Sequence, residues 1–318
     1  MNYDIFNGDA DGIISLLQLR LANPIESQLV TGVKRDIQLL KKITAERGDL
    51  LTILDISMEK NSSELNAALA AGANVIYFDH HRSGDIPNNS QLEAHIDLDP
   101  NICTALLVDK KLDGQFHHWA ITAAYGDNLI ARADELAKLA GFTEQQAELL
   151  KEFGTLINYN GYGAEVSDLH YDPAELYQAL LVYSSPFEAI NDKASPFYKL
   201  RDAYKEDMQN ALAVKPSHQS KRLSVYELPQ QLWAKRISGV YGNLLANQNP
   251  DAAHAVLTLN VDKTYTVSLR APLNNKQGAG DICSQFVSGG GRAAAAGVNA
   301  LPKLQVADFI EAVESYYQ

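Results

Sequence analysis

An aspartate and two histidines stand together at the end of an apolar run, in the stretch YFDHHRSG at residues 77–84. Asp79 offers a hard oxygen donor, and His80 and His81 offer imidazole nitrogens, a ligand mixture that suits manganese, iron or zinc better than calcium. If the apolar run is a strand, its carboxyl end is where open parallel sheets place their chemistry. The alternative is that the three residues are ordinary polar groups on the surface.

Three further segments carry aspartates in comparable surroundings. Asp9 and Asp11 follow a short apolar run and precede Gly12, which allows a sharp turn. Asp55 follows the apolar residues of ILDIS, and Asp127 follows a glycine in AAYGDNLIA, where a buried helix is expected. Taken alone, each segment is equally well explained by a solvated turn, a helix cap or a buried charge with a partner.

Together, these segments supply four aspartates and a histidine to one candidate site. Crowded carboxylates repel one another and raise one another's pKa values, so they need cations to stay ionised. Two divalent ions would balance the charge of the four aspartates, which favours a two-metal centre. A second histidine pair, His117 and His118, lies in a helical pattern without acidic neighbours in the sequence and is expected to be structural.

Composition and charge restrict the class of protein. The chain of 318 residues suggests two domains, and its 46% hydrophobic and 21% charged residues are ordinary for a globular protein. No apolar run approaches the ~18 residues of a membrane span, and the first residues lack the pattern of a secretion signal, so a cytoplasmic location is expected. Cys103 and Cys283 are expected to pack as small hydrophobic residues.

The net charge of −12 disfavours a protein that coats long nucleic acid, because such binding depends on Lys and Arg neutralising phosphates. Small phosphorylated substrates or very short oligonucleotides need only a local positive pocket. Lys34 and Arg35 either line the rim of such a site or begin a solvated helix.

The first half of the sequence alternates short apolar runs with helical patterns. This alternation predicts a parallel sheet with crossover helices. The expected strands lie within 3–7, 27–33, 50–57 and 74–81, and the expected helices within 12–22, 36–43 and 62–72. Each of these strands ends in polar residues, which would meet at the carboxyl edge of the sheet: Asp9 and Asp11, Lys34 and Arg35, Asp55 and Ser57, and Asp79, His80 and His81.

The second half of the sequence lacks this regular alternation of strands and helices. Residues 103–185 are mainly helical in pattern, and two prolines interrupt the periodicity within 184–196. A helix is expected over 197–213, with a domain boundary within 186–220. The last hundred residues contain β-rich runs, then a glycine-rich turn and a terminal helix.

Taken in order, the motifs resemble those of the DHH phosphoesterase superfamily, across nearly the whole chain. Its four amino-terminal motifs correspond to DAD at 9–11, LDIS at 54–57, DHH at 79–81 and GDN at 126–128. The glycine-rich signature of its DHH-associated domain corresponds to GGGRAAAAG at 289–297. Within the superfamily, the nanoRNases, bisphosphate-nucleotide phosphatases and DHH exonucleases are the most similar in type.

The resemblance implies an α/β fold in two parts. A catalytic, metal-binding DHH domain with a mostly parallel sheet and flanking helices is expected at 1–190. A linker helix is expected at 191–215. A smaller α/β DHH-associated domain at 216–318 would bind substrate across a cleft.

The resemblance also implies a ligand set for two manganese ions, with magnesium or cobalt able to substitute. Asp9 would bind one ion and Asp11 the other, and Asp55 would bridge both. His80 and Asp127 would complete the coordination of the second ion.

Catalytic and substrate-binding roles follow from the same resemblance. His81 would face the phosphate, Asp79 would orient the histidines, and Asp55 would act with them in catalysis. A distal phosphate or nucleotide would be held by Arg270, Gly289, Gly290, Gly291 and Arg292.

The sequence departs from the family pattern at two places. Ile5 stands where many relatives have a histidine, so the first metal position lacks that ligand, and Asn7 is the candidate to supply an oxygen or hold a water. Arg292 stands where a histidine often follows the glycines, which favours phosphate recognition.

The implied activity is hydrolysis of phosphodiester or phosphomonoester bonds by water that two metal ions activate. Short oligonucleotides, dinucleotides and bisphosphate nucleotides are the expected substrates. Two alternatives remain open: an inorganic pyrophosphatase or exopolyphosphatase, and a catalytically inactive nucleotide-binding sensor. No membrane partner is expected. The sequence leaves the oligomeric state open, a homodimer included.

Overall fold

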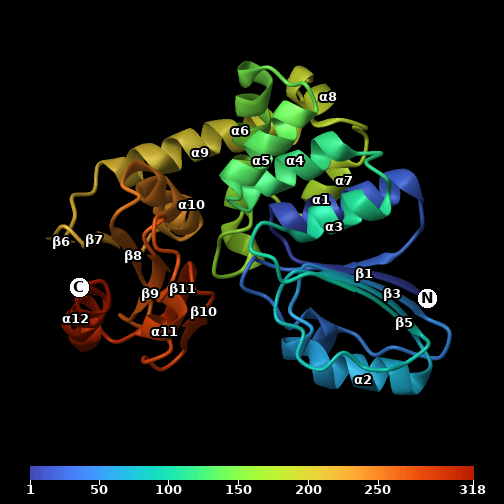
Figure 1. The fold of residues 1–318 in the computed structure, drawn as a ribbon, viewed down its shortest axis with the longest axis horizontal. Helices are drawn as coiled ribbons and strands as arrows, with labels where there is room; N and C mark the ends of the chain where they lie inside the picture. Colours follow the sequence, from blue (N-terminus) through green and yellow to red (C-terminus); the bar gives the residue numbers. More distant parts are fainter. The chain divides into compact units, whose positions relative to one another are not determined.

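The computed structural model describes residues 1–318, which form two compact units, Met1–Asp202 and Ala203–Gln318 (Figure 1). Helix α9, Pro196–Leu212, continues from the first unit into the second. None of the helices combines the length and the apolar composition that crossing a membrane requires. Both cysteines, Cys103 and Cys283, are buried and form no disulfide.

A five-stranded sheet organises the first unit. Its strand order is β2-β1-β3-β4-β5, and every neighbouring pair is parallel. The strands are β1 Asn2–Phe6, β2 Gln28–Val30, β3 Leu50–Leu54, β4 Asn74–Asp79 and β5 Leu92–Ile96. The edge strand β5 was not expected from the sequence, because its residues LEAHI are half exposed and lack a continuous apolar pattern.

Helices cover both faces of this sheet, so its central strands are apolar on both sides. Figure 1 shows α2 on one face and α1, α3 and α4 on the other. The helices are α1 Ala10–Ala22, α2 Ser62–Ala71, α3 Thr104–Lys111, α4 His117–Gly126, α5 Ile130–Leu139, α6 Glu144–Asn160, α7 Pro173–Leu180 and α8 Pro186–Asn191. Short 3-10 turns complete the unit: η1 Leu39–Lys42, η2 Glu59–Asn61 and η3 Val166–Asp168.

The helix expected over 36–43 is only the single turn η1. Asn61 explains the difference, because its side chain takes over hydrogen bonds that a helix would make. Its Nδ2 donates to the Ile37 carbonyl at 2.7 Å, and its Oδ1 accepts from the Leu40 amide at 3.4 Å. Such bonds from Asn side chains compete with helix formation.

The long helical pattern around residue 127 is interrupted rather than continuous. Helix α4 ends at Gly126, Asn128 has a left-handed backbone with φ of 62°, and α5 begins at Ile130. Asp127 therefore lies at the C-cap of α4 and not within a buried helix as expected. The break places its carboxylate outside the regular helix.

A mixed six-stranded sheet forms the second unit, in the order β10-β11-β9-β8-β7-β6. Strands β7 and β8 are parallel, and the other pairs are antiparallel. The strands are β6 His218–Gln219, β7 Leu223–Leu228, β8 Ala253–Leu259, β9 Tyr265–Arg270, β10 Gly289–Gly291 and β11 Ala295–Leu301. The α/β fold class expected for both parts is confirmed.

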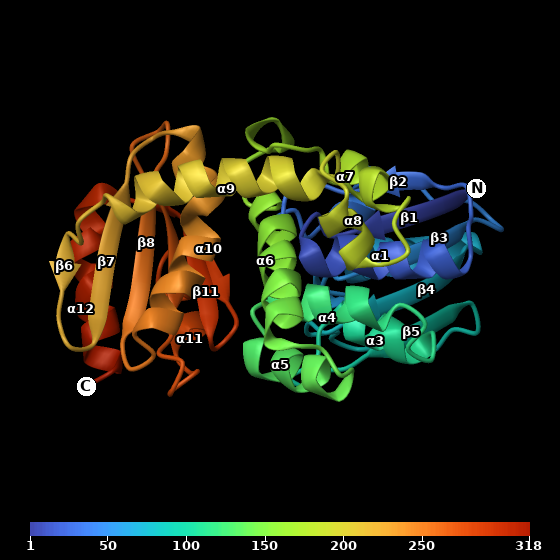
Figure 2. The same cartoon turned by 90° about the horizontal axis from the view of Figure 1, so that it is seen from above.

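Helices lie on both faces of the second sheet (Figure 2). Phe309 and Val313 of α12 pack with Ile282 of α11 and with strand residues in one hydrophobic core, while α10 lies on the opposite face. The bounds are α10 Leu232–Gln248, α11 Ala279–Cys283, η4 Lys303–Gln305 and α12 Val306–Tyr316.

Close packing at Gly126 is open to a direct test. A Cβ atom there would lie 2.5 Å from the Ala10 Cβ and 2.7 Å from the Gly154 carbonyl oxygen. Gly126→Ala is therefore expected to lower the free energy of unfolding by about 1–3 kcal/mol, as overpacking does, despite the better helix propensity of alanine. Urea denaturation measures the change. Ala131→Ser, which also adds one heavy atom but at an exposed helical position, should leave stability nearly unchanged; equal stability of both variants would contradict this packing.

Candidate metal centre

Strands β1, β3 and β4 are parallel neighbours, so their carboxyl ends lie at one edge of the sheet and bring together the predicted site residues that stand at those ends. Asp9 follows β1 and caps α1, because its Oδ1 accepts the amides of Asp11 at 3.0 Å and Gly12 at 3.1 Å. Asp55 follows β3 directly, and Asp79 is the last residue of β4. Parallel strands that end at one edge thus explain why distant parts of the sequence meet.

Asp55 occupies a strained backbone conformation at the centre of this edge. Its φ is 58°, in the left-handed region that non-glycine residues seldom adopt. Its amide donates to the Phe78 carbonyl at 3.0 Å, which fixes the turn after β3. Thr104 Oγ1 donates to its Oδ1 at 3.3 Å. Strain of this kind is held by the surrounding structure and is common at functional sites.

The ring of His80 is held by the main chain in an orientation that a metal ion could use. Its Nδ1 lies 2.7 Å from the Ile102 carbonyl, an acceptor only, so Nδ1 carries the proton and Nε2 carries the lone pair. Nε2 is buried, has no hydrogen-bond partner, and lies 3.4 Å from Asp55 Oδ1 and 3.7 Å from Asp11 Oδ2. A lone pair aimed at carboxylate oxygens is unfavourable unless a proton or a metal ion lies between them. The residues present therefore fit a divalent metal ion.

Asp11 is held by the first turn of α3. The amides of Thr104 and Ala105 donate to its two carboxylate oxygens at 2.8 and 2.7 Å. The N-terminal end of a helix stabilises negative charge. Burial nevertheless raises the pKa of Asp11, and repulsion from the Asp127 carboxylate adds to the shift. The amides orient a carboxylate that still needs a cation.

His81 has a different orienting partner from His80. Its Nδ1 lies 2.7 Å from Asp79 Oδ1, and Asp79 is fully buried. Asp79 thus orients His81 through a hydrogen bond, whereas the sequence suggested that it would orient both histidines; the Ile102 carbonyl holds His80 instead. The oxygen and nitrogen ligand atoms of Asp55, His80 and His81 all lie within 4.8 Å of one another, close enough to share one ion.

Lys34, which follows β2, lies inside the site. Its Nζ donates to Asp9 Oδ2 and to Asn158 Oδ1, the latter at 3.1 Å, and lies 3.9 Å from Asp127 Oδ1. From the sequence, Lys34 was expected either at the rim or in a solvated helix. The signal that could have identified it is its position after a strand, at the same edge as the aspartates.

Charges within the aspartate cluster, meaning Asp9, Asp11, Asp55 and Asp127, are unevenly compensated. Burial opposes ionisation of Asp9, but the Lys34 ammonium outweighs burial and lowers the pKa of Asp9 to about 2. Burial, and then repulsion from Asp11 and Asp9, raises the pKa of Asp55 well above its ordinary value. The part of the cluster next to His80 is therefore the part that lacks positive charge.

Arg270, at the end of β9, is fixed within the second unit. Its Nε donates to Asn243 Oδ1 at 2.6 Å, its Nη1 to Ser268 Oγ at 2.9 Å and its Nη2 to the Gly239 carbonyl at 3.2 Å. These bonds hold the guanidinium plane in one orientation. A fixed plane suits recognition of a phosphate.

The glycine-rich segment is a strand and not the expected turn. Gly289–Gly291 form β10, which pairs with β11 at the edge of the sheet. A Cβ at Gly289 would lie 1.8 Å from the Cys283 carbonyl oxygen, and one at Gly291, where φ is 145°, would lie 2.5 Å from the Ala296 Cα. Packing therefore requires these two glycines, but a Cβ at Gly290 would meet nothing within 4 Å.

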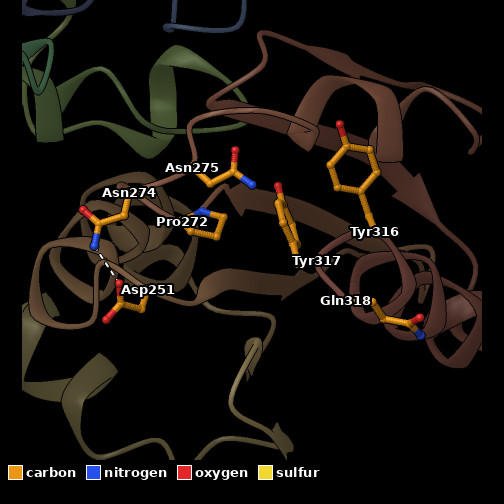
Figure 3. Close-up of a pocket in the computed structure, with 7 residues that line it drawn as sticks. All are labelled: Asp251, Pro272, Asn274, Asn275, Tyr316, Tyr317 and Gln318. Atoms are coloured by element: carbon orange, nitrogen blue, oxygen red, sulfur yellow. Dashed lines mark hydrogen bonds between the residues drawn. The ribbon is translucent and has the colours of Figure 1, made fainter.

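A shallow pocket in the second unit contains none of the predicted site residues (Figure 3). Asn274 Nδ2 donates to Asp251 Oδ1 at 2.6 Å on one side of it. The pocket is lined by Asp251, Pro272, Asn274, Asn275, Tyr316, Tyr317 and Gln318. We assign no function to it.

The other histidine pair has structural contacts. His117 Nδ1 lies 2.6 Å from Asp109 Oδ2, an acidic neighbour in space that the sequence did not reveal. His118 packs edge-on against Phe142 and Phe187.

Removing one buried charge from the metal centre should separate stability from metal binding. Because the pKa of Asp55 is raised in the folded protein, its contribution to stability is favourable below the unfolded pKa and is lost as pH rises through the folded pKa. At neutral pH an ionised Asp55 therefore lowers the free energy of unfolding. Asp55→Asn, which tolerates the same backbone, should leave the metal-free protein at least as stable as the wild type. Mn²⁺ at a hundred times its dissociation constant should stabilise the wild type by about 2.7 kcal/mol and the variant by much less.

Thermal unfolding with and without Mn²⁺ measures both effects. Asp113→Asn is the matched control, because Asp113 also has a positive φ, of 51°, but is exposed. An equal Mn²⁺-induced shift in wild type and Asp55→Asn would exclude Asp55 as a ligand.

No protein-family model and no curated protein matches the sequence. Solved structures do match it. The pGpG-specific phosphodiesterase PggH of Vibrio cholerae matches with 16% identity and a TM-score of 0.56, over 100% of this chain and 99% of that one. RecJ of Thermus thermophilus, solved in complex with Mn²⁺, matches with 17% identity and a TM-score of 0.62. That match covers 99% of this chain and 52% of RecJ.

A further exonuclease RecJ, bound to manganese, matches with 17% identity and a TM-score of 0.55, over 99% of this chain and 89% of that one. Structural matches at such low sequence identity establish only the fold of this chain. Together with the Asp-His-His cluster at the carboxyl edge of the sheet, they show that this chain has the fold of the DHH phosphoesterases and carries, as Asp79, His80 and His81, the sequence for which that superfamily is named.

Proposed function

We propose that the chain is a divalent-metal-dependent hydrolase that cleaves phosphoester bonds of short oligonucleotides, linear dinucleotides or bisphosphate nucleotides. The observation that carries this proposal is the unpartnered Nε2 of His80, buried 3.4 Å from Asp55 Oδ1 and 3.7 Å from Asp11 Oδ2. A protein that only binds nucleotides has no need of this arrangement, because buried charges without partners lower stability.

The proposed ligands divide into two positions. Asp11, Asp55 and His80 form the first, and Asp9 and Asp127 form the second. Manganese is the proposed ion, with magnesium or cobalt able to substitute, since hard oxygens and one imidazole suit these metals. An ion bound there would polarise phosphoryl oxygens and lower the pKa of a bound water.

His81 is proposed as the residue that exchanges a proton or hydrogen bond with the substrate. Asp79 Oδ1 accepts from its Nδ1 at 2.7 Å, which fixes the tautomer, and Nε2 is the nitrogen proposed to face the reacting group. A buried carboxylate that holds a histidine in this way also stabilises the protonated ring. His81 could then donate to a phosphate oxygen or to the leaving group.

The second unit is proposed to bind the part of the substrate that does not react. Arg270 has a fixed guanidinium plane, and Arg292 follows the glycine strand. Among the three glycines of that strand, Gly290 alone has room for a Cβ atom, so packing does not explain why a glycine stands there. Close approach of a phosphate to its backbone would explain it. The division into a catalytic domain at 1–190, a linker helix at 191–215 and a substrate-binding domain at 216–318 stays a prediction.

Two observations favour short substrates. The net charge of −12 gives little attraction for long nucleic acid. The chain also spans 99% of the length of a pGpG-specific phosphodiesterase, compared with 52% and 89% of the two RecJ chains.

A substrate panel tests the proposal. Purified protein with Mn²⁺ would be offered a linear dinucleotide such as pGpG, a 3′,5′-bisphosphate nucleotide, a cyclic dinucleotide, pyrophosphate and polyphosphate. We expect turnover of the first two, loss of turnover in Asp55→Asn, and retention in Asp113→Asn. Turnover of pyrophosphate or polyphosphate alone would replace the proposed substrate class, and tight binding of nucleotides without turnover would indicate a sensor.

The proposed role of His81 predicts a selective loss of catalysis. His81→Asn should lower kcat by about 10²–10⁴-fold, the usual contribution of a general acid or base, and should flatten one limb of the pH profile. The amount of bound Mn²⁺ should be unchanged if His81 serves the substrate rather than the ion. A matching loss of Mn²⁺, measured by elemental analysis, would instead make His81 a metal ligand.

A further inference from the structure

We propose that the ammonium group of Lys34 is a built-in cation beside Asp9 and Asp127, so that the chain binds one divalent ion tightly, at Asp11, Asp55 and His80. The second position is then filled by the protein itself. This inference rests on the metal centre of the proposed function, and it replaces the two ions expected from the sequence by one ion and one lysine.

The surroundings of the Lys34 ammonium resemble a cation site. Three oxygens from separate parts of the chain face it: Asp9 Oδ2 and Asn158 Oδ1 accept hydrogen bonds, and Asp127 Oδ1 lies 3.9 Å away. Carboxylate and amide oxygens are also what a hard metal ion would require. A lysine with three donors can satisfy the same oxygens.

Lys34 is also fixed by its main chain. Its amide donates to the Gly161 carbonyl at 2.8 Å, and its carbonyl accepts from Asn7 Nδ2 at 3.2 Å. A Cβ at Gly161 would lie 2.9 Å from the Gly8 carbonyl oxygen, so this segment packs directly on the loop that carries Asp9. The side chain is only 26% exposed. The lysine is thus a built part of the site and not a surface residue that folds over it.

The two positions of the cluster differ in what they lack. Both carboxylate oxygens of Asp9 have a donor: Lys34 for Oδ2, and backbone amides for Oδ1. Around His80, the buried Nε2 has no partner. A divalent ion therefore gains an unused ligand at the His80 position, whereas at the Asp9 position it must first displace an ammonium.

Charge balance points the same way. One divalent ion together with Lys34 nearly neutralises the four carboxylates of the aspartate cluster. A second divalent ion beside a retained lysine would compete for the oxygens that face the ammonium, and two cations that close together repel each other strongly in a buried site. Expelling the lysine would remove its three oxygen partners. Either route makes the second ion bind much more weakly than the first.

Mn²⁺ stoichiometry tests this inference without reference to catalysis. Titration of the whole protein, followed by electron paramagnetic resonance of free Mn²⁺ and by calorimetry, should give one tight equivalent per chain. In Lys34→Met, which keeps the length but removes the charge, a second equivalent should appear, tightened by at least about tenfold, or 1.4 kcal/mol. The control is Lys42→Met, because Lys42 pairs with Asp36 at 3.3 Å on the exposed surface. It should match the wild type.

Wild type that binds two ions with similar affinity would overturn the inference, and so would one tight ion in both wild type and Lys34→Met. If Lys34→Met fails to fold, the wild-type stoichiometry and Lys34→Arg decide: one tight ion in each supports the inference, and two in either contradicts it. Failure of the proposed function has a different signature, namely one tight ion but no turnover of any phosphoester. Turnover with two tight ions would refute only the role of Lys34.

Discussion

Repulsion between buried carboxylates is the constraint on which the rest of the first unit depends. The four carboxylates of the aspartate cluster converge on one edge of a parallel sheet, where burial makes each charge costly. Folding brings them together because strands β1 and β3 end there and α4 ends nearby. Their repulsion is tolerable only if cations are supplied, and the chain supplies one of its own in Lys34.

Groups of the surrounding fold orient the side chains of the candidate site. Helix α3 presents two amides to Asp11, the Ile102 carbonyl turns His80, and the buried carboxylate of Asp79 turns His81. Asp55, whose own backbone is in the strained left-handed region, lies beside both histidines. Asp11 and His80 are thus each held by a group from another segment, which is what preorganisation of a metal site requires.

Much of this site was predictable because carboxylates and histidines that follow apolar strands leave a visible pattern. The order of the motifs located Asp9, Asp11, Asp55 and His80 and indicated the parallel sheet. The groups that orient them were not predictable, since backbone carbonyls and amides carry no sequence signature.

Three further features depended on packing that the sequence pattern does not contain. The sequence leaves Lys34 either at a rim or at the start of a solvated helix, because the partners of its ammonium lie far away in the sequence. Asp127 was placed on a helix because the apolar periodicity continues across residues 127–129, although the chain breaks there. The glycines of β10 suggested a turn, yet antiparallel pairing with β11 holds them extended. In each case contacts between distant segments outweighed the local pattern.

The most direct test of this metal centre is the position of manganese in a crystal grown or soaked with Mn²⁺, located by anomalous diffraction. We predict a strong peak bonded to His80 Nε2 and to oxygens of Asp55 and Asp11, with the Lys34 ammonium still beside Asp9. Absence of manganese from His80 in a crystal that binds the ion elsewhere would contradict the assignment.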